Sequence, residues 1–157
     1  MRAEIRAVGR LKAGPERTLV DDYLARATAQ GRALGLGPFT ERETDPRSLK
    51  DRAAETAALL DALEPGAAVF VLDETGRTLG SADFSGLLAR HRDEGVRQAV
   101  FLIGGADGHE RALLPAGARL ISYGAATWPH KLVRVMLAEQ LYRAVSLIAG
   151  SPYHREG

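Results

Sequence analysis

One segment indicates how the last third of the chain folds: Thr127-Trp128-Pro129-His130-Lys131-Leu132-Val133-Arg134. Proline lacks an amide proton and fixes one backbone dihedral, so Pro129 suits the first turn of a helix, where that proton would be unpaired. From Pro129 to about Ala149 neither proline nor glycine interrupts the pattern, and Gly150 followed by Pro152 supplies a stop. The sequence therefore predicts a long closing helix.

Apolar residues of this predicted helix occupy nearly its whole circumference rather than one stripe. A helix that is apolar on most sides is usually covered on both. One cover would be the chain's own sheet, and the other could be a second copy of the protein, so the pattern motivates a homodimer hypothesis. The residues concerned are Leu132, Val133, Val135, Met136, Leu137, Leu141, Val145, Leu147 and Ile148.

The length of 157 residues fits one domain, 1–157, with a sizeable core, and 45% hydrophobic with 26% charged residues is the usual globular balance. No apolar run approaches the roughly 20 residues that cross a bilayer. The charged start of the sequence is unlike a signal peptide. We therefore expect a cytoplasmic protein with no membrane partner.

There is no cysteine, which excludes disulfides, thiolate nucleophiles and cysteine-ligated metals. The four histidines show no metal-ligand spacing, so we expect no metal. The net charge of +1 gives no global attraction to nucleic acid. Any RNA binding would have to come from a local patch.

Hydrophobic periodicity and turn residues predict strands that alternate with helices. Ser81 is the expected cap of the third helix, and Asp73 to Arg77 the expected polar turn after a strand. The alternation favours an α/β fold in which helices flank a mostly parallel sheet. Strands are expected at 3–8, 34–41, 67–72, 98–103 and 119–123, and helices at 15–31, 45–63, 81–95, 109–114 and 129–149.

Ligands bind such sheets at the carboxyl ends of the strands, where loops 72–76, 104–108 and 122–129 are expected. The middle loop, Gly104-Gly105-Ala106-Asp107-Gly108, is neither the dinucleotide fingerprint nor the phosphate-binding loop. Close approach of its backbone to a ligand and a plain turn are about equally good interpretations.

Three further features have both a structural and a functional interpretation. His130, in the first turn of the helix, fits a structural histidine better than a catalytic one. Glu139 and Arg143, spaced i, i+4, could simply pair, or Arg143 could face a phosphate. The tail Tyr153-His154-Arg155 carries a ring, an imidazole and a guanidinium that suit a nucleotide, or it is an unstructured polar end.

Five segments together resemble the ribosomal RNA large subunit methyltransferase H family. The resemblance covers the full chain and is most specific in its final third. The segments are LDETGR (72–77), LIGGADG (102–108), TWPHKLVR (127–134), EQLYRA (139–144) and GSPYHR (150–155).

That family belongs to the SPOUT class of methyltransferases. The resemblance implies transfer of a methyl group from S-adenosylmethionine, the cosubstrate, to N3 of a pseudouridine in 23S rRNA, in the large subunit or the assembled ribosome. It also implies a homodimer and an α/β fold with a trefoil knot near the C-terminus. Because the general prior runs strongly against knots, the knot rests on the resemblance alone.

The resemblance assigns the cofactor pocket to the three strand-end loops. Leu72 and Gly105 would line it, and the adenosine and methionine parts would be wrapped by Gly124, Ala125, Ala126, Thr127, Trp128 and Pro129. The sequence departs from the commoner pattern here, since Tyr123-Gly124-Ala125-Ala126 replaces a serine-rich stretch of larger side chains. Trp128 stands where leucine or phenylalanine is frequent. Side-chain packing around the cofactor is therefore left open.

Methylation at N3 of a uracil ring requires removal of a weakly acidic proton. His154, with an ordinary pKa near 6.5, is the expected general base. Tyr153 could stack on the flipped base, while Arg155 and Arg143 could hold phosphate or a uracil carbonyl. His130 would order the cofactor loop or contact RNA. The tail could reach the partner's cofactor, so that each site would be built from two chains.

Two other functions compete with the enzyme: a non-catalytic RNA-binding module on the ribosome, and a small-molecule nucleotide-binding regulator. The modest net charge argues against the first, because RNA modules normally carry a strong basic footprint. The tail, which a nucleotide sensor would not need, argues against the second. Low charge also favours an assembled particle over naked rRNA as the substrate.

Overall fold

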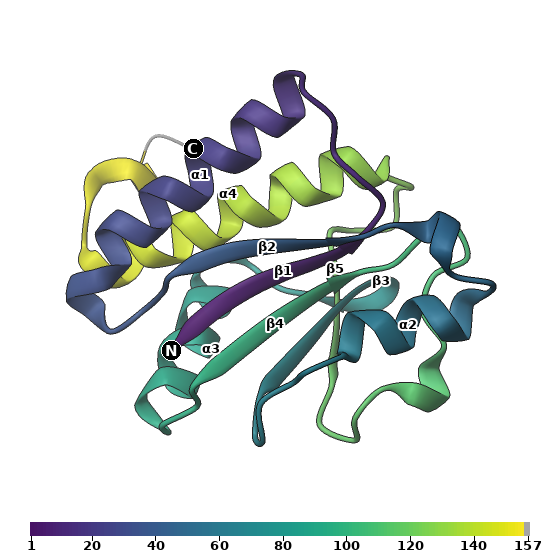
Figure 1. The fold of residues 1–157 in the computed structure, drawn as a ribbon. Coiled ribbons are helices and arrows are strands. Elements are labelled where there is room, and N and C mark those ends of the chain that lie inside the picture. Colours follow the sequence, from purple (N-terminus) through teal and green to yellow (C-terminus); the bar gives the residue numbers. More distant parts are fainter. Residues whose placement is uncertain (156–157) are drawn as a thin grey trace.

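The computed structural model describes residues 1–155, apart from the side chain of His154. Within them, five parallel strands form one sheet in the order β2-β1-β4-β3-β5, flanked by four α-helices (Figure 1). The strands are β1 (Arg2–Val8), β2 (Phe39–Thr44), β3 (Ala68–Thr78), β4 (Gln98–Ile103) and β5 (Arg119–Ser122). The helices are α1 (Pro15–Gly31), α2 (Arg52–Leu60), α3 (Ser81–Asp93) and α4 (His130–Ala149), with short 3-10 turns η1 (Arg32–Leu34), η2 (Pro46–Ser48), η3 (Arg111–Leu113) and η4 (Pro152–Arg155).

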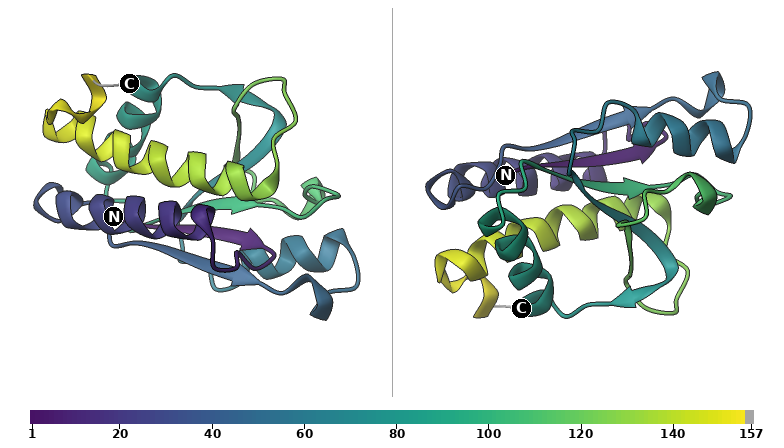
Figure 2. Two further views of the ribbon diagram at one scale, coloured as in Figure 1. Left: turned by 90° about the horizontal axis from the view of Figure 1, so that it is seen from above. Right: turned by 90° about the horizontal axis from the view of Figure 1, so that it is seen from below.

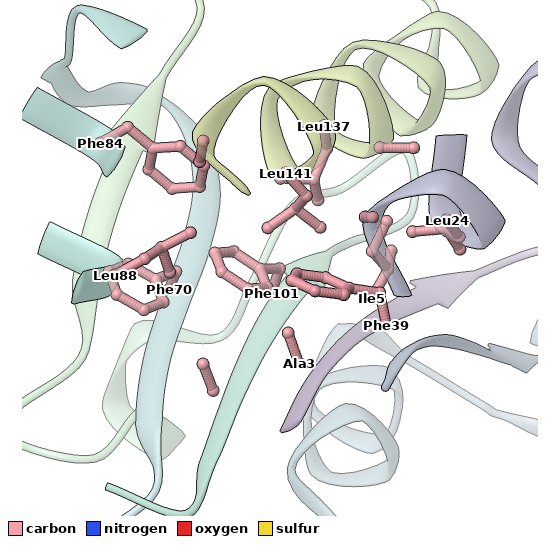
Figure 3. Packing of buried hydrophobic residues seen from close by; sticks show 14 of the residues in the cluster. Ala3, Ile5, Leu24, Phe39, Phe70, Phe84, Leu88, Phe101, Leu137 and Leu141 are labelled. Carbon is pink, nitrogen blue, oxygen red and sulfur yellow. The ribbon is translucent and has the colours of Figure 1, made fainter. Parts of the chain in front are cut away.

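Helices cover both faces of the sheet, which confirms the predicted α/β class. Helices α1, α3 and α4 lie on one face, with α1 and α4 side by side, and α2 lies on the other (Figures 1 and 2). The larger core is on the three-helix face, where the ring of Phe101 stacks on that of Phe70 at 4.9 Å between centroids and meets that of Phe84 edge-on at 5.9 Å (Figure 3). All six residues of β4 are buried because it lies in the middle of the sheet with helices on both sides.

The closing helix begins and ends where proline and glycine predict. Pro129 precedes α4, and Gly150 closes it with a left-handed φ of 68°, its N–H bonding to carbonyl oxygens of the last turn. Both α1 and α3 contact α4, so the chain itself covers much of the apolar circumference. Leu132 nevertheless remains 41% exposed. The homodimer is therefore still a prediction.

Several predicted boundaries are wrong for local reasons. Strand β2 begins at Phe39, not near residue 34, because Gly35 and Gly37 adopt positive φ and interrupt the extended chain. The helix expected over 45–63 is two pieces: the turn η2, and α2, whose first turn is capped by the Asp51 carboxylate accepting from the Ala54 N–H at 2.8 Å.

Two further boundaries differ around α3 and η3. Gly80, not Ser81, precedes α3, because the Ser81 hydroxyl donates to the side chain of Gln140 at 2.7 Å instead of capping its own helix. The short helix expected over 109–114 is only the 3-10 turn η3, a single turn before the chain becomes extended at Leu114.

The expected polar turn after β3 is instead a bulge within a longer strand. Strand β3 runs on to Thr78, and its pairing with β5 shifts between Leu72 and Arg77. Gly76 lies in this bulge against the backbone of β5. A Cβ at Gly76 would lie 2.6 Å from the Ile121 nitrogen and 2.6 Å from the Leu120 carbonyl carbon. The bulge therefore requires glycine.

We expect Gly76→Ala to lower the free energy of unfolding by about 1–3 kcal/mol, because the new methyl group can be accommodated only by moving the backbone of β5. Urea unfolding of the two proteins measures the difference. Gly117→Ala is the matched control, since a Cβ there has no neighbour within 4 Å. Equal stability of the Gly76 variant and the control would contradict the close approach.

Candidate functional site

A cavity of about 470 Å³ lies at the carboxyl edge of the sheet. Because β4, β3 and β5 are neighbours and parallel, the loops that follow them meet there, as expected from the sequence. Six of the eight residues assigned to cofactor binding line the cavity: Leu72, Gly105, Gly124, Ala126, Thr127 and Trp128. The other two, Ala125 and Pro129, belong to the same segment but do not line it.

The glycine-rich loop after β4 folds tightly on itself. The Gly108 N–H donates to the Gly105 carbonyl at 3.0 Å. A Cβ at Gly104 would lie 2.9 Å from the Gly108 carbonyl oxygen, and one at Gly105 would lie 2.7 Å from a carboxylate oxygen of Glu55. The turn therefore requires glycine at Gly104, where the neighbour is backbone, whereas at Gly105 the flexible Glu55 side chain could move aside. Both glycines leave backbone facing the cavity.

One wall of the cavity carries the carboxylate of Asp73. It accepts hydrogen bonds from the Thr75 N–H at 2.9 Å and hydroxyl at 2.5 Å, and from Arg111 at 3.2 Å. Burial opposes ionisation, but these hydrogen bonds and the charge of Arg111 outweigh it and lower the pKa of Asp73. The cavity thus holds an ionised carboxylate in a wall that mixes apolar, polar and charged side chains.

The segment after β5 closes back on itself over the cavity. The Gly124 N–H donates to the Ser122 hydroxyl at 3.1 Å, and the Trp128 indole N–H donates to the Tyr123 carbonyl at 3.3 Å. Trp128 is 42% exposed. The next helix begins with His130, which is exposed at the cavity. This position fits contact with a ligand, which agrees better with the role in the cofactor loop or in RNA contact than with a purely structural histidine.

The tail residues lie apart from this cavity, along α4. The Tyr153 hydroxyl donates to the Glu139 carboxylate at 3.1 Å, and Arg143 pairs with the same carboxylate at 2.7 Å while its guanidinium lies 5.0 Å from the Tyr153 ring centre. Glu139 is nine residues beyond His130, about 13 Å along the helix axis. The structure therefore brings Tyr153 and Arg143 together but does not bring either to the cavity.

The structure says less about the positions of the other two tail residues, Arg155 and His154. Arg155 is exposed. The side chain of His154, the expected base, lies outside the described residues. Both belong to η4, which follows α4 directly.

A family described as "Predicted SPOUT methyltransferase" matches residues 1–154. The chain belongs to the SPOUT methyltransferase family. Proteins called "Ribosomal RNA large subunit methyltransferase H" are similar over nearly the whole chain: that of Maricaulis maris is 60% identical over 156 residues, 99% of this chain and 100% of the relative. Those of Ruegeria pomeroyi and Dinoroseobacter shibae are 52% and 50% identical over 155 residues, 99% of both chains.

These comparisons confirm the resemblance drawn from the sequence, and this SPOUT methyltransferase is an enzyme. The trefoil knot that the resemblance implies remains a prediction. Among residues 1–155, no group of three or more histidine, aspartate or glutamate side chains could hold a metal ion. No helix in this part of the chain is both long and apolar enough to cross a membrane.

A second, smaller groove of about 250 Å³ in this SPOUT methyltransferase shares one lining residue with the cavity and one residue with the tail cluster. Tyr123 lines both the cavity and the groove, and Glu139, which holds the tail, lines the groove. Burial raises the pKa of Tyr123, so its hydroxyl stays neutral. Tyr123 is therefore common to the cavity and the groove.

His109 is a cavity residue to which sequence reasoning gave no role. Its side chain is only 7% exposed, and neither ring nitrogen has a hydrogen-bond partner among the described residues. Burial lowers the pKa of His109, although the nearby Asp73 carboxylate opposes the change. Its position directly after the glycine-rich loop was the available signal, but the sequence alone does not show that the ring is buried.

The lowered pKa of His109 predicts a pH effect on the stability of this SPOUT methyltransferase. The folded state binds fewer protons than the unfolded state once the pH falls below the ordinary histidine pKa of 6.5, so stability is full above that pH and decreases below it. His109→Leu should therefore reduce the loss of melting temperature between about pH 7.5 and 5.5. Burial also lowers the pKa of His91, so His91 contributes to the pH dependence in the same direction and part of it should remain in the variant. Identical pH dependence in the variant and the wild type would refute the assignment.

Proposed function

We propose that this SPOUT methyltransferase transfers a methyl group from S-adenosylmethionine to N3 of a pseudouridine in the ribosomal RNA of the large subunit, and that it acts in the cytoplasm. The observation that carries the proposal is the cavity at the carboxyl ends of β3, β4 and β5. Relatives that are 50–60% identical over almost the whole chain are called ribosomal RNA large subunit methyltransferases, which supports ribosomal RNA as the substrate. The choice of a pseudouridine N3 rests on the family resemblance.

The cavity suits an adenosyl cosubstrate. Its volume of about 470 Å³ lies in the range of small-molecule sites. Leu72, Ile103 and Val133 offer apolar surface to a purine and its sugar, while the ionised Asp73 and the backbone of the glycine-rich loop offer polar partners. S-adenosylmethionine supplies an electrophilic methyl group on a sulfonium.

The remaining work for the protein is positioning and proton removal. The pseudouridine N3 must lose its proton at or before attack on the methyl group, and a general base contributes roughly 10²- to 10⁴-fold to such a step. We assign the base to His154, stacking of the flipped base to Tyr153, and contacts with phosphate or a carbonyl to Arg143 and Arg155. Each of these four residues belongs to α4 or the tail that follows it.

We infer that the site is shared between two copies of the chain. Tyr153 is held at Glu139 by a hydrogen bond of 3.1 Å, and Glu139 is six residues, about 9 Å along α4, beyond Val133, the residue of this helix nearest to it that lines the cavity. A tail in this position does not serve the cavity of its own chain. In a homodimer that buries the groove and the exposed Leu132, the tail of one chain could serve the cavity of the other.

Complementation tests the shared site. A variant truncated before Pro152 and a Gly105→Trp variant, whose new side chain would fill the cavity, should each be inactive. Mixed and allowed to exchange subunits, they should recover part of the wild-type methyl transfer, because one of the two sites in a heterodimer is intact. Complete failure to recover activity in verified heterodimers would contradict shared sites.

The proposed function is tested by binding and by activity. S-adenosylhomocysteine at about 100 times its Kd should stabilise the fold by about 2.7 kcal/mol, seen as a higher melting temperature. Labelled methyl transfer to assembled ribosomes, separate subunits and free rRNA, with the modified base mapped, then identifies the substrate, for which we expect the assembled particle. No thermal shift at saturating ligand would favour the alternative, a non-catalytic RNA-binding module.

A further inference from the structure

The carboxyl edge of the sheet carries exposed basic side chains that make no ion pair among residues 1–155. Arg10 and Lys12 lie in the loop after β1, Lys50 follows η2, and Lys131 lies in the first turn of α4. Most other cations of the described chain are paired with carboxylates, as Arg17 and Arg134 are. These four are therefore available to an external anion.

Contacts within the chain bring Lys131 close to the loop after β1. The Arg134 guanidinium donates to the carbonyl of Gly9 at 3.0 Å. Lys131 is three residues before Arg134, so both occupy the same face of α4. Arg10 directly follows Gly9, which places Lys131 beside the loop that carries Arg10 and Lys12.

The same loop also approaches the segment after β2. Hydrogen bonds from Arg47 chiefly, with a smaller contribution from the charge of Arg10, lower the pKa of Asp45 to about 2. The Gly9 N–H donates to the Thr44 carbonyl at 2.8 Å, which places Arg10 beside Asp45, and Lys50 is five residues further along. The Asp45 carboxylate is already paired with Arg47 at 2.7 Å, so it does not cancel the neighbouring cations.

These side chains lie at the same end of the sheet as the cavity. Lys131 adjoins His130, which lines the cavity, and the loops after β1 and β2 lie on the same side of the molecule as the start of α4 (Figure 1). The chain as a whole has 21 basic and 20 acidic residues, so without these four it would have a net charge of −3. The net charge of the whole chain is too small to attract RNA by itself, so the positive charge that RNA binding requires has to be local.

We propose that Arg10, Lys12, Lys50 and Lys131 form a basic track that binds RNA phosphates and leads the substrate strand to the cavity. This inference rests on the proposed function, since it describes how that site meets its substrate. Phosphate contacts position a nucleic acid without reading its sequence, so the track supplies affinity and orientation, and the cavity supplies the choice of base.

The opposite edge of the sheet provides a matched control. Arg32 follows α1, Arg90 is near the end of α3, and Arg119 begins β5. All three are exposed and make no ion pair within the described residues. Replacing them with glutamine changes the net charge as much as replacing three cations of the track.

The experiment compares two triple variants, Arg10→Gln/Lys12→Gln/Lys131→Gln and Arg32→Gln/Arg90→Gln/Arg119→Gln. Each is titrated with purified large ribosomal subunits at salt concentrations between about 50 and 200 mM. The track variant should bind at least tenfold more weakly at the lowest salt, and its plot of log affinity against log salt should be shallower by about two to three. The control variant should keep the wild-type slope.

Binding of S-adenosylhomocysteine separates failure of the track from failure of the proposed function. Both triple variants should bind it like the wild type, which also shows that they are folded. Absence of this binding in the wild type would refute the proposed function, whereas equal salt slopes for the two variants would overturn the track alone. If the track triple does not fold, Lys131→Gln replaces it, with an expected change in slope of about one and no change as the contradicting result.

Discussion

His154→Ala is expected to slow methyl transfer by about 10²- to 10⁴-fold, the usual contribution of a general base. The imidazole, with an ordinary pKa near 6.5, can take the N3 proton at neutral pH, and no other group in the tail titrates in that range. Binding of S-adenosylhomocysteine should stay unchanged, because the cavity is built from the three strand-end loops. The loss should therefore appear in kcat.

Single-turnover methyl transfer to assembled ribosomes, followed from about pH 5.5 to 8, measures this effect. The wild-type rate should rise with pH as His154 loses its proton, and the alanine variant should lack that rise. His130→Ala is the comparison, since His130 lies at the cavity but is not the proposed base. A larger loss at His130 than at His154, or a near wild-type rate for His154→Ala, would refute the assignment.

Arg134→Met is expected to lower the free energy of unfolding by about 3–5 kcal/mol, the cost of removing one partner from a buried charge network. The Arg134 side chain is 5% exposed, and its guanidinium lies 3.2 Å from the Glu41 carboxylate and 3.4 Å from that of Glu43. Only Arg17, which also bonds to both glutamates, would remain to neutralise them.

Chemical denaturation monitored by circular dichroism measures the change. Arg26→Met is the control, because its i, i+4 pair with Asp22 is half exposed on both sides and exposed pairs contribute little. A loss much smaller than that of Arg134→Met is expected there, and it includes the contact of the Arg26 guanidinium with the Tyr142 ring, whose centre is 5.8 Å away. If Arg134→Met were as mild as the control, the network would not hold the start of α4 against the ends of β1 and β2.

The sequence predicted best those features that depend on near neighbours. Pro129 and Gly150 mark the ends of α4, and β4 has the predicted bounds, because helix capping and continuous apolar runs are local properties. It failed where local signals compete. Asp45 begins a turn rather than the helix that starts after Asp51, and Gly76 sits in a bulge that only its closeness to β5 reveals.

The candidate site likewise has features that the sequence predicted and features that it did not. The loops that would hold the cosubstrate were named from the sequence because ligands bind where parallel strands end, and six of the eight residues assigned there line one cavity. The burial of His109 and the position of Tyr123 in both the cavity and the groove were not predictable. Each depends on contacts between segments that are distant in the chain.

The sequence by itself therefore determined the elements and the family, since periodicity, capping residues and motifs are written in contiguous residues. Only the tertiary structure decided which distant segments and side chains contact each other. It placed β5 next to β3 rather than β4, paired Arg134 with a carboxylate 93 positions earlier, and brought the residues of the proposed basic track together from two loops and the first turn of α4. The physical reason is that strand pairing and buried charge networks gain their free energy from contacts between distant segments, and no local pattern records which partners will meet.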